Sequence, residues 1–91
     1  MWRLGRTDTF VRTARRLVQR DPRLKPHIEA TLGLLELDPH HPRLKLHQLR
    51  GSLDGLWAVR VTYRIRLVLT LDAESRSILL LDIGSHDEVY R

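Results

Sequence analysis

The chain has 91 residues, of which 42% are hydrophobic and 30% charged, and it contains no cysteine. This length allows one domain, residues 1–91, with one modest core, and the lack of cysteine excludes a disulfide framework or a thiolate metal site. The 16 lysines and arginines against 11 acidic residues give a net charge of +5, which favours an anionic partner such as nucleic acid or an acidic protein.

The first residues predict a short strand followed by a helix. Residues 2–4 (Trp-Arg-Leu) have strand character, and Thr7 or Asp8 is a suitable N-cap for the helix that follows. Apolar residues then recur at helical spacing, while arginines fill the other face. The apolar positions are Phe10, Ala14, Leu17 and Val18. Asp21-Pro22 ends this helix and begins the next one.

A second helix is predicted between Asp21-Pro22 and the segment that starts at Asp38. Its apolar stripe consists of Leu24, Ile28, Leu32 and Leu35. Pro26 lies about one turn inside, so the helix either begins near this residue or kinks there. Residues 38–42 (Asp-Pro-His-His-Pro) end the helix, and we expect the two helices to form a hairpin packed on a sheet.

The second half of the chain predicts strands. After a basic connection at residues 43–55, residues 56–71 would extend to roughly 50 Å as one strand, about twice the diameter of a domain of this size. This segment must therefore fold back, around Thr62-Tyr63. Residues 72–76 predict a hairpin loop, and residues 77–83 predict a central strand that is apolar on both faces.

The resulting order is β-α-α-β-β-β, an α+β fold. In this fold a helical hairpin covers one face of a small, curved, mainly antiparallel sheet and leaves the other face partly free. No apolar run reaches the roughly 18 residues of a membrane-spanning helix, and the N-terminus has no apolar signal-peptide segment. We expect no membrane contact and a cytoplasmic location.

Arginines gather where two strands of this sheet meet. Strands place alternate residues on opposite faces, so Val59 is core material and Arg60 points away from the core. After the turn, Arg64 and Arg66 alternate with apolar residues, and antiparallel pairing would bring Arg60 close to Arg64. A solvated, charge-protected sheet face is the simpler explanation, but such a face usually mixes lysine, glutamate and threonine. No acid lies between Arg60 and Arg66, which favours a functional cationic patch.

Ionisable residues follow the last strand. Histidine is the side chain best suited to transfer a proton near neutral pH, which makes His86 a candidate acid or base. Tyr90 can stack on a base or bind a phosphate. His47, before the first long strand, can reach the same end of the sheet. Together with arginines that stabilise charge on phosphorus, this set suits phosphodiester cleavage. In RNA the 2′-OH supplies the nucleophile, so no metal or other cofactor is required.

Each of these residues also has a structural explanation. A lone C-terminal histidine such as His86 is more often a surface residue, and Tyr90 can simply cover the core edge. Zinc is a weak alternative for the histidines, because their spacing matches no structural zinc pattern. The histidines considered are His40, His41, His47 and His86.

Three segments resemble the RelE/ParE superfamily of bacterial type II toxin–antitoxin toxins, with the RelE/StbE and YafQ-like branch nearest. The resemblance extends over nearly the whole chain. It is carried by residues 44–52 (Leu-Lys-Leu-His-Gln-Leu-Arg-Gly-Ser), by residues 57–66 and by the ending at residues 83–90 (Ile-Gly-Ser-His-Asp-Glu-Val-Tyr). The ending is the most specific of the three.

The resemblance implies a microbial-ribonuclease-like fold and cleavage of mRNA on the ribosome, with an antitoxin that wraps and blocks the toxin. His86 matches a YafQ-like catalytic histidine and His47 a histidine before the Gly-Ser turn. Tyr90 matches the C-terminal aromatic of RelE-like toxins. Arg60 and Arg64 match basic positions of RelE-like strands.

The pattern is a hybrid of two branches. YafQ-like toxins have a histidine and an aspartate at the positions of Arg60 and Arg64, and RelE-like toxins use an arginine near the position of His86. We expect a catalytic set of His86, Arg64, Arg60, Tyr90 and His47, with Lys45, Arg50 and Arg66 as RNA contacts. A ParE-like toxin that inhibits DNA gyrase without catalysis is the alternative, and a degenerate module that only binds an antitoxin is a third possibility.

Overall fold

The computed structural model describes residues 1–53 and 55–90 and confirms an α+β fold built on a five-stranded sheet. In chain order the elements are β1 (Arg3–Arg6), α1 (Asp8–Arg20), α2 (Leu24–Leu37), the 3₁₀ helix η1 (Pro42–Leu44), β2 (His47–Gln48), the 3₁₀ helix η2 (Gly51–Leu53), β3 (Trp57–Arg60), β4 (Ile65–Asp72), β5 (Ser77–Ser85) and α3 (His86–Val89). The strand order is β1-β5-β4-β3-β2. β1 is parallel to β5 and the other pairs are antiparallel, so the sheet is mainly antiparallel as expected.

Thr7 fixes the start of α1 and ties this helix to the sheet. Its hydroxyl accepts a hydrogen bond from the Phe10 amide at 3.1 Å, which makes Thr7 the N-cap. The same hydroxyl lies 2.9 Å from the Leu80 carbonyl oxygen in β5 and donates to it. The N-terminus of α1 is therefore anchored to the interior of the sheet.

The second helix tolerates its proline without a kink. α2 begins at Leu24, so Pro26 is the third helical residue. Amide groups in the first turn have no partner inside a helix, and the missing N–H of proline costs nothing there. No helix in the described part of the chain combines the length and apolar character needed to cross a membrane.

The strands turn back where the length argument predicts. β3 ends at Arg60 and β4 begins at Ile65, which places the turn at residues 61–64. The Thr62 hydroxyl accepts hydrogen bonds from the amides of Arg64 and Ile65, at 3.3 and 3.1 Å. A threonine hydroxyl that holds the backbone in this way explains a turn without glycine.

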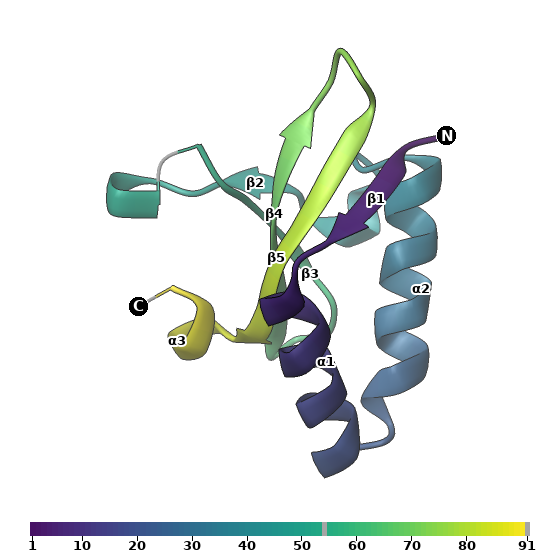
Figure 1. Cartoon of the computed structure of the whole chain (residues 1–91), viewed down its shortest axis with the longest axis vertical. Helices are drawn as coiled ribbons and strands as arrows, with labels where there is room; N and C mark the ends of the chain where they lie inside the picture. Colours follow the sequence, from purple (N-terminus) through teal and green to yellow (C-terminus); the bar gives the residue numbers. More distant parts are fainter. Residues whose placement is uncertain (54, 91) are drawn as a thin grey trace.

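The sheet separates two apolar clusters. The larger cluster lies between the sheet and the helical hairpin of α1 and α2, with Leu35, Val59 and Leu67 fully buried. A smaller cluster on the opposite face is centred on Leu49 and on other buried residues of the strands. Figure 1 shows the arrangement, with α1 and α2 on one side of the strands and α3 near the other.

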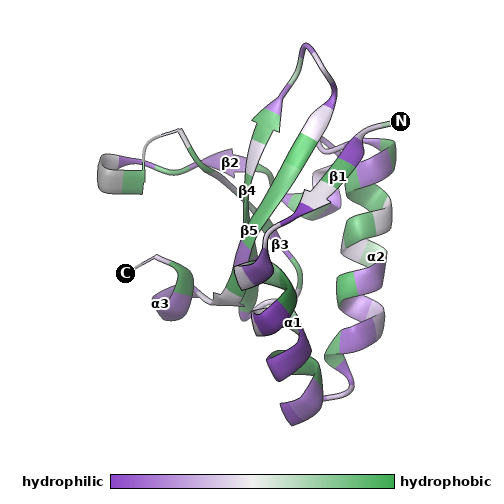
Figure 2. Ribbon diagram, in the orientation of Figure 1, coloured by the Kyte–Doolittle hydropathy of each residue, from purple (hydrophilic) through white to green (hydrophobic). Residues whose placement is uncertain are grey.

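The second cluster corrects the expectation of a partly free face. The sequence predicted neither β2 nor α3, and the cluster includes a residue next to β2 and residues at the end of α3. Leu53 and Leu56 pack there from one side, and Val89 and Tyr90 from the other. Hydrophobic segments of β4 and β5 run through the centre of the molecule, while the outer surface of α1 is hydrophilic (Figure 2).

Candidate active site

The C-terminal motif folds into a short capped helix at the end of β5. Ser85 is the N-cap of α3, and its hydroxyl accepts a hydrogen bond from the Glu88 amide at 3.3 Å. The Glu88 carboxylate in turn accepts from the Ser85 amide at 2.9 Å. This reciprocal pair is a capping box. It turns the chain sharply at Ser85 and so fixes the direction in which His86 leaves the sheet.

Gly84 allows α3 to lie against the strand that precedes it. A Cβ atom at Gly84 would lie 3.2 Å from Glu88 Oε1, 3.3 Å from Glu88 Cβ and 3.4 Å from Val89 Cγ1. Gly84 is buried, and a side chain at this position would require the Glu88 and Val89 side chains to shift by a few tenths of an ångström. The glycine in the motif is therefore explained by close packing of α3.

His86 and Tyr90 lie one helical turn apart and their rings touch. The ring centroids are 4.4 Å apart and the ring planes are perpendicular, which is an edge-to-face contact. The His86 side chain is 70% exposed, and its Nδ1 lies 3.6 Å from the Asp87 carboxylate. The imidazole is thus held on one side by an aromatic ring and remains open to solvent on the other.

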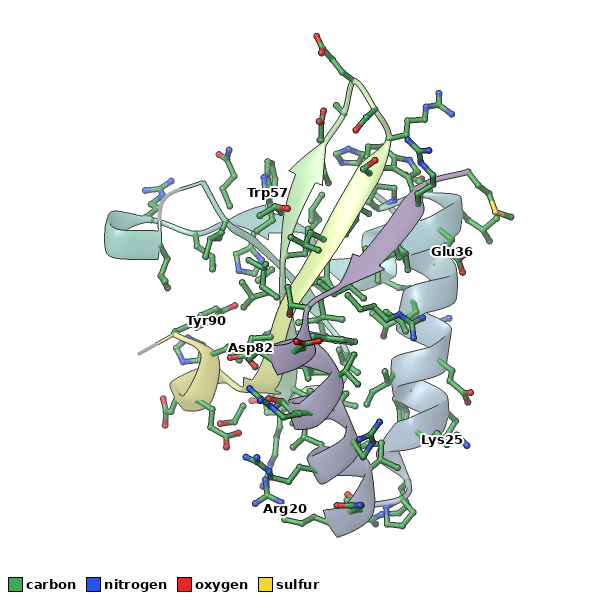
Figure 3. The ribbon with its side chains drawn as sticks, viewed as in Figure 1. Arg20, Lys25, Glu36, Trp57, Asp82 and Tyr90 are labelled. Carbon is green, nitrogen blue, oxygen red and sulfur yellow. The ribbon has the colours of Figure 1, made fainter. Side chains whose placement is uncertain are left out.

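Tyr90 points from the end of α3 toward the sheet (Figure 3). Its ring packs on the second cluster, and its Oη is buried without a hydrogen-bond partner among the described residues. Burial raises the pKa of Tyr90, and the nearby Arg66 charge lowers that pKa in part. The phenol therefore stays protonated at neutral pH and lies within electrostatic range of Arg66.

Arg66, on β4, is the sheet residue whose charge acts on Tyr90 at the C-terminal end of α3. It is the cross-strand partner of Arg60 on β3 and of Gly84 on β5. Its Nη1 donates hydrogen bonds to the carbonyl oxygens of Thr62 and Tyr63, at 2.9 and 3.0 Å. These bonds hold the guanidinium at the β3–β4 turn while its charge reaches Tyr90.

Arg64 is not the cross-strand partner of Arg60. The register pairs Arg60 with Arg66, because β3 stops at Arg60 and Arg64 falls in the turn. Arg64 is exposed and lines a pocket with Arg23 and Leu24, beside the joint between α1 and α2. The structure therefore groups Arg66 with the C-terminal motif and places Arg64 elsewhere.

His47 belongs to the same face of the sheet as Arg60 and Arg66. It is the cross-strand partner of Ala58, whose side chain is part of the second cluster, and paired residues share a face. Its Nδ1 lies 2.9 Å from the Lys45 carbonyl oxygen, so the neutral ring donates from Nδ1 and keeps Nε2 as an acceptor. His47 is exposed and is suited to accept a proton at Nε2.

The residues expected to contact RNA lie at several separate places on the molecule. Lys45 lines a pocket with Arg43 and Arg60 at the edge of β3. Arg50 is exposed beyond β2, and its role as an RNA contact stays a prediction. Arg43 was not anticipated, although its spacing of two residues from Lys45 in a basic segment was a usable signal.

Asp82 was also not among the residues that the sequence predicted for this face of the sheet. It is the cross-strand partner of Val68 and so shares the face of the second cluster. Its carboxylate accepts a hydrogen bond from the Ile83 amide at 2.8 Å. The signal was an aspartate within an otherwise apolar strand. Over residues 1–53 and 55–90, no group of three or more His, Asp or Glu residues could hold a metal ion.

The sequence matches no protein-family model and no curated protein. Solved structures match it over nearly its full length. YafQ from E. coli has 16% identity, a TM-score of 0.81 and complete coverage of both chains. A metal-bound toxin from Helicobacter pylori has 24% identity and a TM-score of 0.77, with 98% of this chain and 99% of that chain covered.

A third match is a YoeB–YefM complex from Staphylococcus aureus. It has 17% identity and a TM-score of 0.73, with 94% of this chain and 98% of the matched chain covered. At these identities the matches show that the chain has the fold of these toxins.

Proposed function

We propose that this chain is the toxin of a type II toxin–antitoxin module and an endoribonuclease that cleaves mRNA. Its mixed set of histidines and arginines resembles both the RelE-like and the YafQ-like toxins. The observation that carries the proposal is the convergence of His86, Tyr90 and Arg66 on one face of the sheet. The shared fold and the resemblance of the C-terminal motif support it.

The chemistry follows from the residue types at this face. The 2′-oxygen of one nucleotide attacks its own 3′-phosphorus, and a base removes the 2′-OH proton. The bond from phosphorus to the 5′-oxygen of the next nucleotide then breaks, and an acid protonates that oxygen. The products are a 2′,3′-cyclic phosphate and a 5′-hydroxyl. His86 is assigned as the acid and His47, through Nε2, as the base.

Arginine stabilises the charge that develops on phosphorus during this attack. Arg66 has this role, with Arg60 beside it, and Arg66 replaces Arg64 in the catalytic set because of the strand register. Tyr90 stays protonated and orients the scissile nucleotide. A buried hydroxyl without a partner costs about 1–3 kcal/mol, and a phosphate oxygen that accepts its hydrogen bond removes this cost.

The partner of such a toxin is an antitoxin that covers the cationic face. The YoeB–YefM complex is a protein of the same fold bound to a second protein. For this chain we propose an acidic antitoxin segment, helical or extended, lying across the face that carries Arg60 and Arg66. The ribosome presents the mRNA substrate.

The test uses purified protein, mRNA and ribosomes, with analysis of the cleaved ends. The proposal predicts 2′,3′-cyclic phosphate and 5′-hydroxyl ends, and no cleavage where the scissile nucleotide lacks its 2′-OH. A His40→Gln variant, which removes an exposed histidine of the loop after α2, serves as the matched control for His86→Gln. Intact mRNA together with inhibition of gyrase supercoiling would instead establish the ParE-like alternative.

A further inference from the structure

The edge of β3 opens into a pocket lined by cations. β2 pairs with β3 only at Trp57 and Ala58, so no described strand lies beside Arg60 on that edge. The segment that includes η1 lies there instead and leaves a cavity of about 450 Å³. We call this cavity the edge pocket; it is lined by Pro42, Arg43, Lys45, Arg60 and Val61.

Arg60, which lines the edge pocket, has an unsatisfied donor. Its Nε is buried and has no hydrogen-bond partner among the described residues. Arg60 also lines a smaller cavity of about 50 Å³ toward Thr31 of α2, and no acidic residue lines either cavity. A guanidinium offers five N–H donors and its charge persists at any physiological pH. The pocket therefore has positive charge and donors but lacks a protein anion to pair with them.

Arg60 connects the edge pocket to the site described above. Arg60 and Arg66 are direct cross-strand partners, and the Cα atoms of such a pair are about 5 Å apart. Arg66 in turn lies within electrostatic range of Tyr90. A line of cations thus runs from the C-terminal motif across β4 and β3 to Arg43 and Lys45 at the sheet edge.

We propose that the edge pocket binds an RNA backbone phosphate next to the one that is cleaved. The inference rests on the proposed ribonuclease function and adds a second subsite to it. RNA carries one phosphate per nucleotide, so a strand with its scissile phosphate at Arg66 presents a neighbouring phosphate within reach of Arg60. Planar guanidinium groups bind phosphate oxygens in pairs, which suits Arg43 and Arg60.

The subsite is tested by binding of RNA that cannot be cleaved. The probes are a 2′-O-methyl hexanucleotide and a 2′-O-methyl dinucleotide with a single phosphate. The variant is Arg43→Gln/Lys45→Asn, in which asparagine suits the left-handed backbone at position 45, where φ is 53°. Both residues are exposed, so the substitutions leave the core intact.

The proposal predicts that the variant binds the hexanucleotide about tenfold more weakly, because charge-assisted hydrogen bonds to one phosphate are lost. The slope of log K against log salt falls by about 0.7, the value for one phosphate contact of a single strand. Affinity for the dinucleotide changes much less. The control Arg12→Gln/Arg16→Gln removes the same charge from the exposed face of α1 and spares the hexanucleotide affinity.

Two results would overturn the subsite while leaving the ribonuclease proposal in place. One is an equal loss of hexanucleotide affinity in the edge-pocket variant and the α1 control. The other is a variant that keeps its RNA affinity but loses binding to poly-L-glutamate, which would make the pocket a carboxylate site. If the parent protein binds neither RNA, on or off ribosomes, and cleaves none, the ribonuclease proposal itself fails.

Discussion

The imidazole of His86 meets the phenol ring of Tyr90 edge to face, with 4.4 Å between the ring centroids. His86 is the first residue of α3, and Tyr90 is the C-cap residue after its single turn. The capping box at Ser85 and the packing at Gly84 hold that turn against the sheet. Most of the C-terminal motif is thus explained by the need to position these two rings.

Ionisation of the Tyr90 phenol should lower the free energy of unfolding at alkaline pH. Burial raises its pKa above the usual 10.0, so the folded state retains a proton that the unfolded state loses. This contribution is complete below pH 10 and is lost as the pH rises through the folded-state pKa. Tyr90→Phe should therefore remove part of the fall in the urea midpoint between neutral and strongly alkaline pH. Parallel pH profiles of parent and variant would contradict the burial of this phenol.

Gly84→Ala should destabilise the protein by about 1–3 kcal/mol, the usual cost of overpacking. The new Cβ would meet Glu88 and Val89 at 3.2–3.4 Å. Gly33→Ala is the matched control, because a Cβ at that position in α2 meets nothing within 4 Å. That control should gain about 0.5–1 kcal/mol from helix propensity. Urea unfolding measures both, and a Gly84→Ala protein as stable as the parent would show that α3 is not packed against β5.

Ser85→Ala removes the N-cap of α3 and should cost about 1 kcal/mol. The effect should be local, because the Ser85 hydroxyl accepts from the Glu88 amide. Hydrogen exchange at that amide should accelerate in the variant, while the amides of α1 keep their protection. Ser75→Ala, in the exposed β4–β5 hairpin, is the control. Unchanged exchange at Glu88 would rule out the capping box.

The variants Arg66→Gln and Arg64→Gln distinguish the roles of two arginines that were both candidates from the sequence. Arg66 reaches Tyr90, whereas Arg64 lies in the turn beside the α1–α2 joint. Loss of a group that stabilises the charged transition state costs about 10²–10³-fold in rate, which we expect for Arg66→Gln. Arg64→Gln should keep most of the parent rate in the ribosome cleavage assay. The reverse ranking would restore the arrangement expected from the sequence.

The sequence was sufficient for the main architecture because local signals were strong there. Helical periodicity from Phe10 onward and the proline after Asp21 defined the helices. The length of residues 56–71 required a turn, and the structure has it at residues 61–64. A small domain must bury an apolar strand such as β5 inside its sheet.

The register between β3 and β4 was harder to predict from the sequence. The turn extends over four residues, and its exact position determines whether Arg64 or Arg66 lies opposite Arg60. No Asn-Gly or Asp-Gly pair marked that position. The short elements β2 and α3 also escaped prediction, because two and four residues are too few to show a periodic apolar pattern. The assignment of His86 and Tyr90 to one site followed from the motif, and the structure adds the ring contact.

Primer extension on mRNA after induction, with parent and His86→Gln proteins compared, is the decisive experiment for ribonuclease activity at the C-terminal motif. We expect discrete cleavage products with the parent and with the control His40→Gln, and their loss with His86→Gln at equal protein level. Identical cleavage patterns from parent and His86→Gln, or no cleavage by the parent in growth-arrested cells, would contradict this expectation.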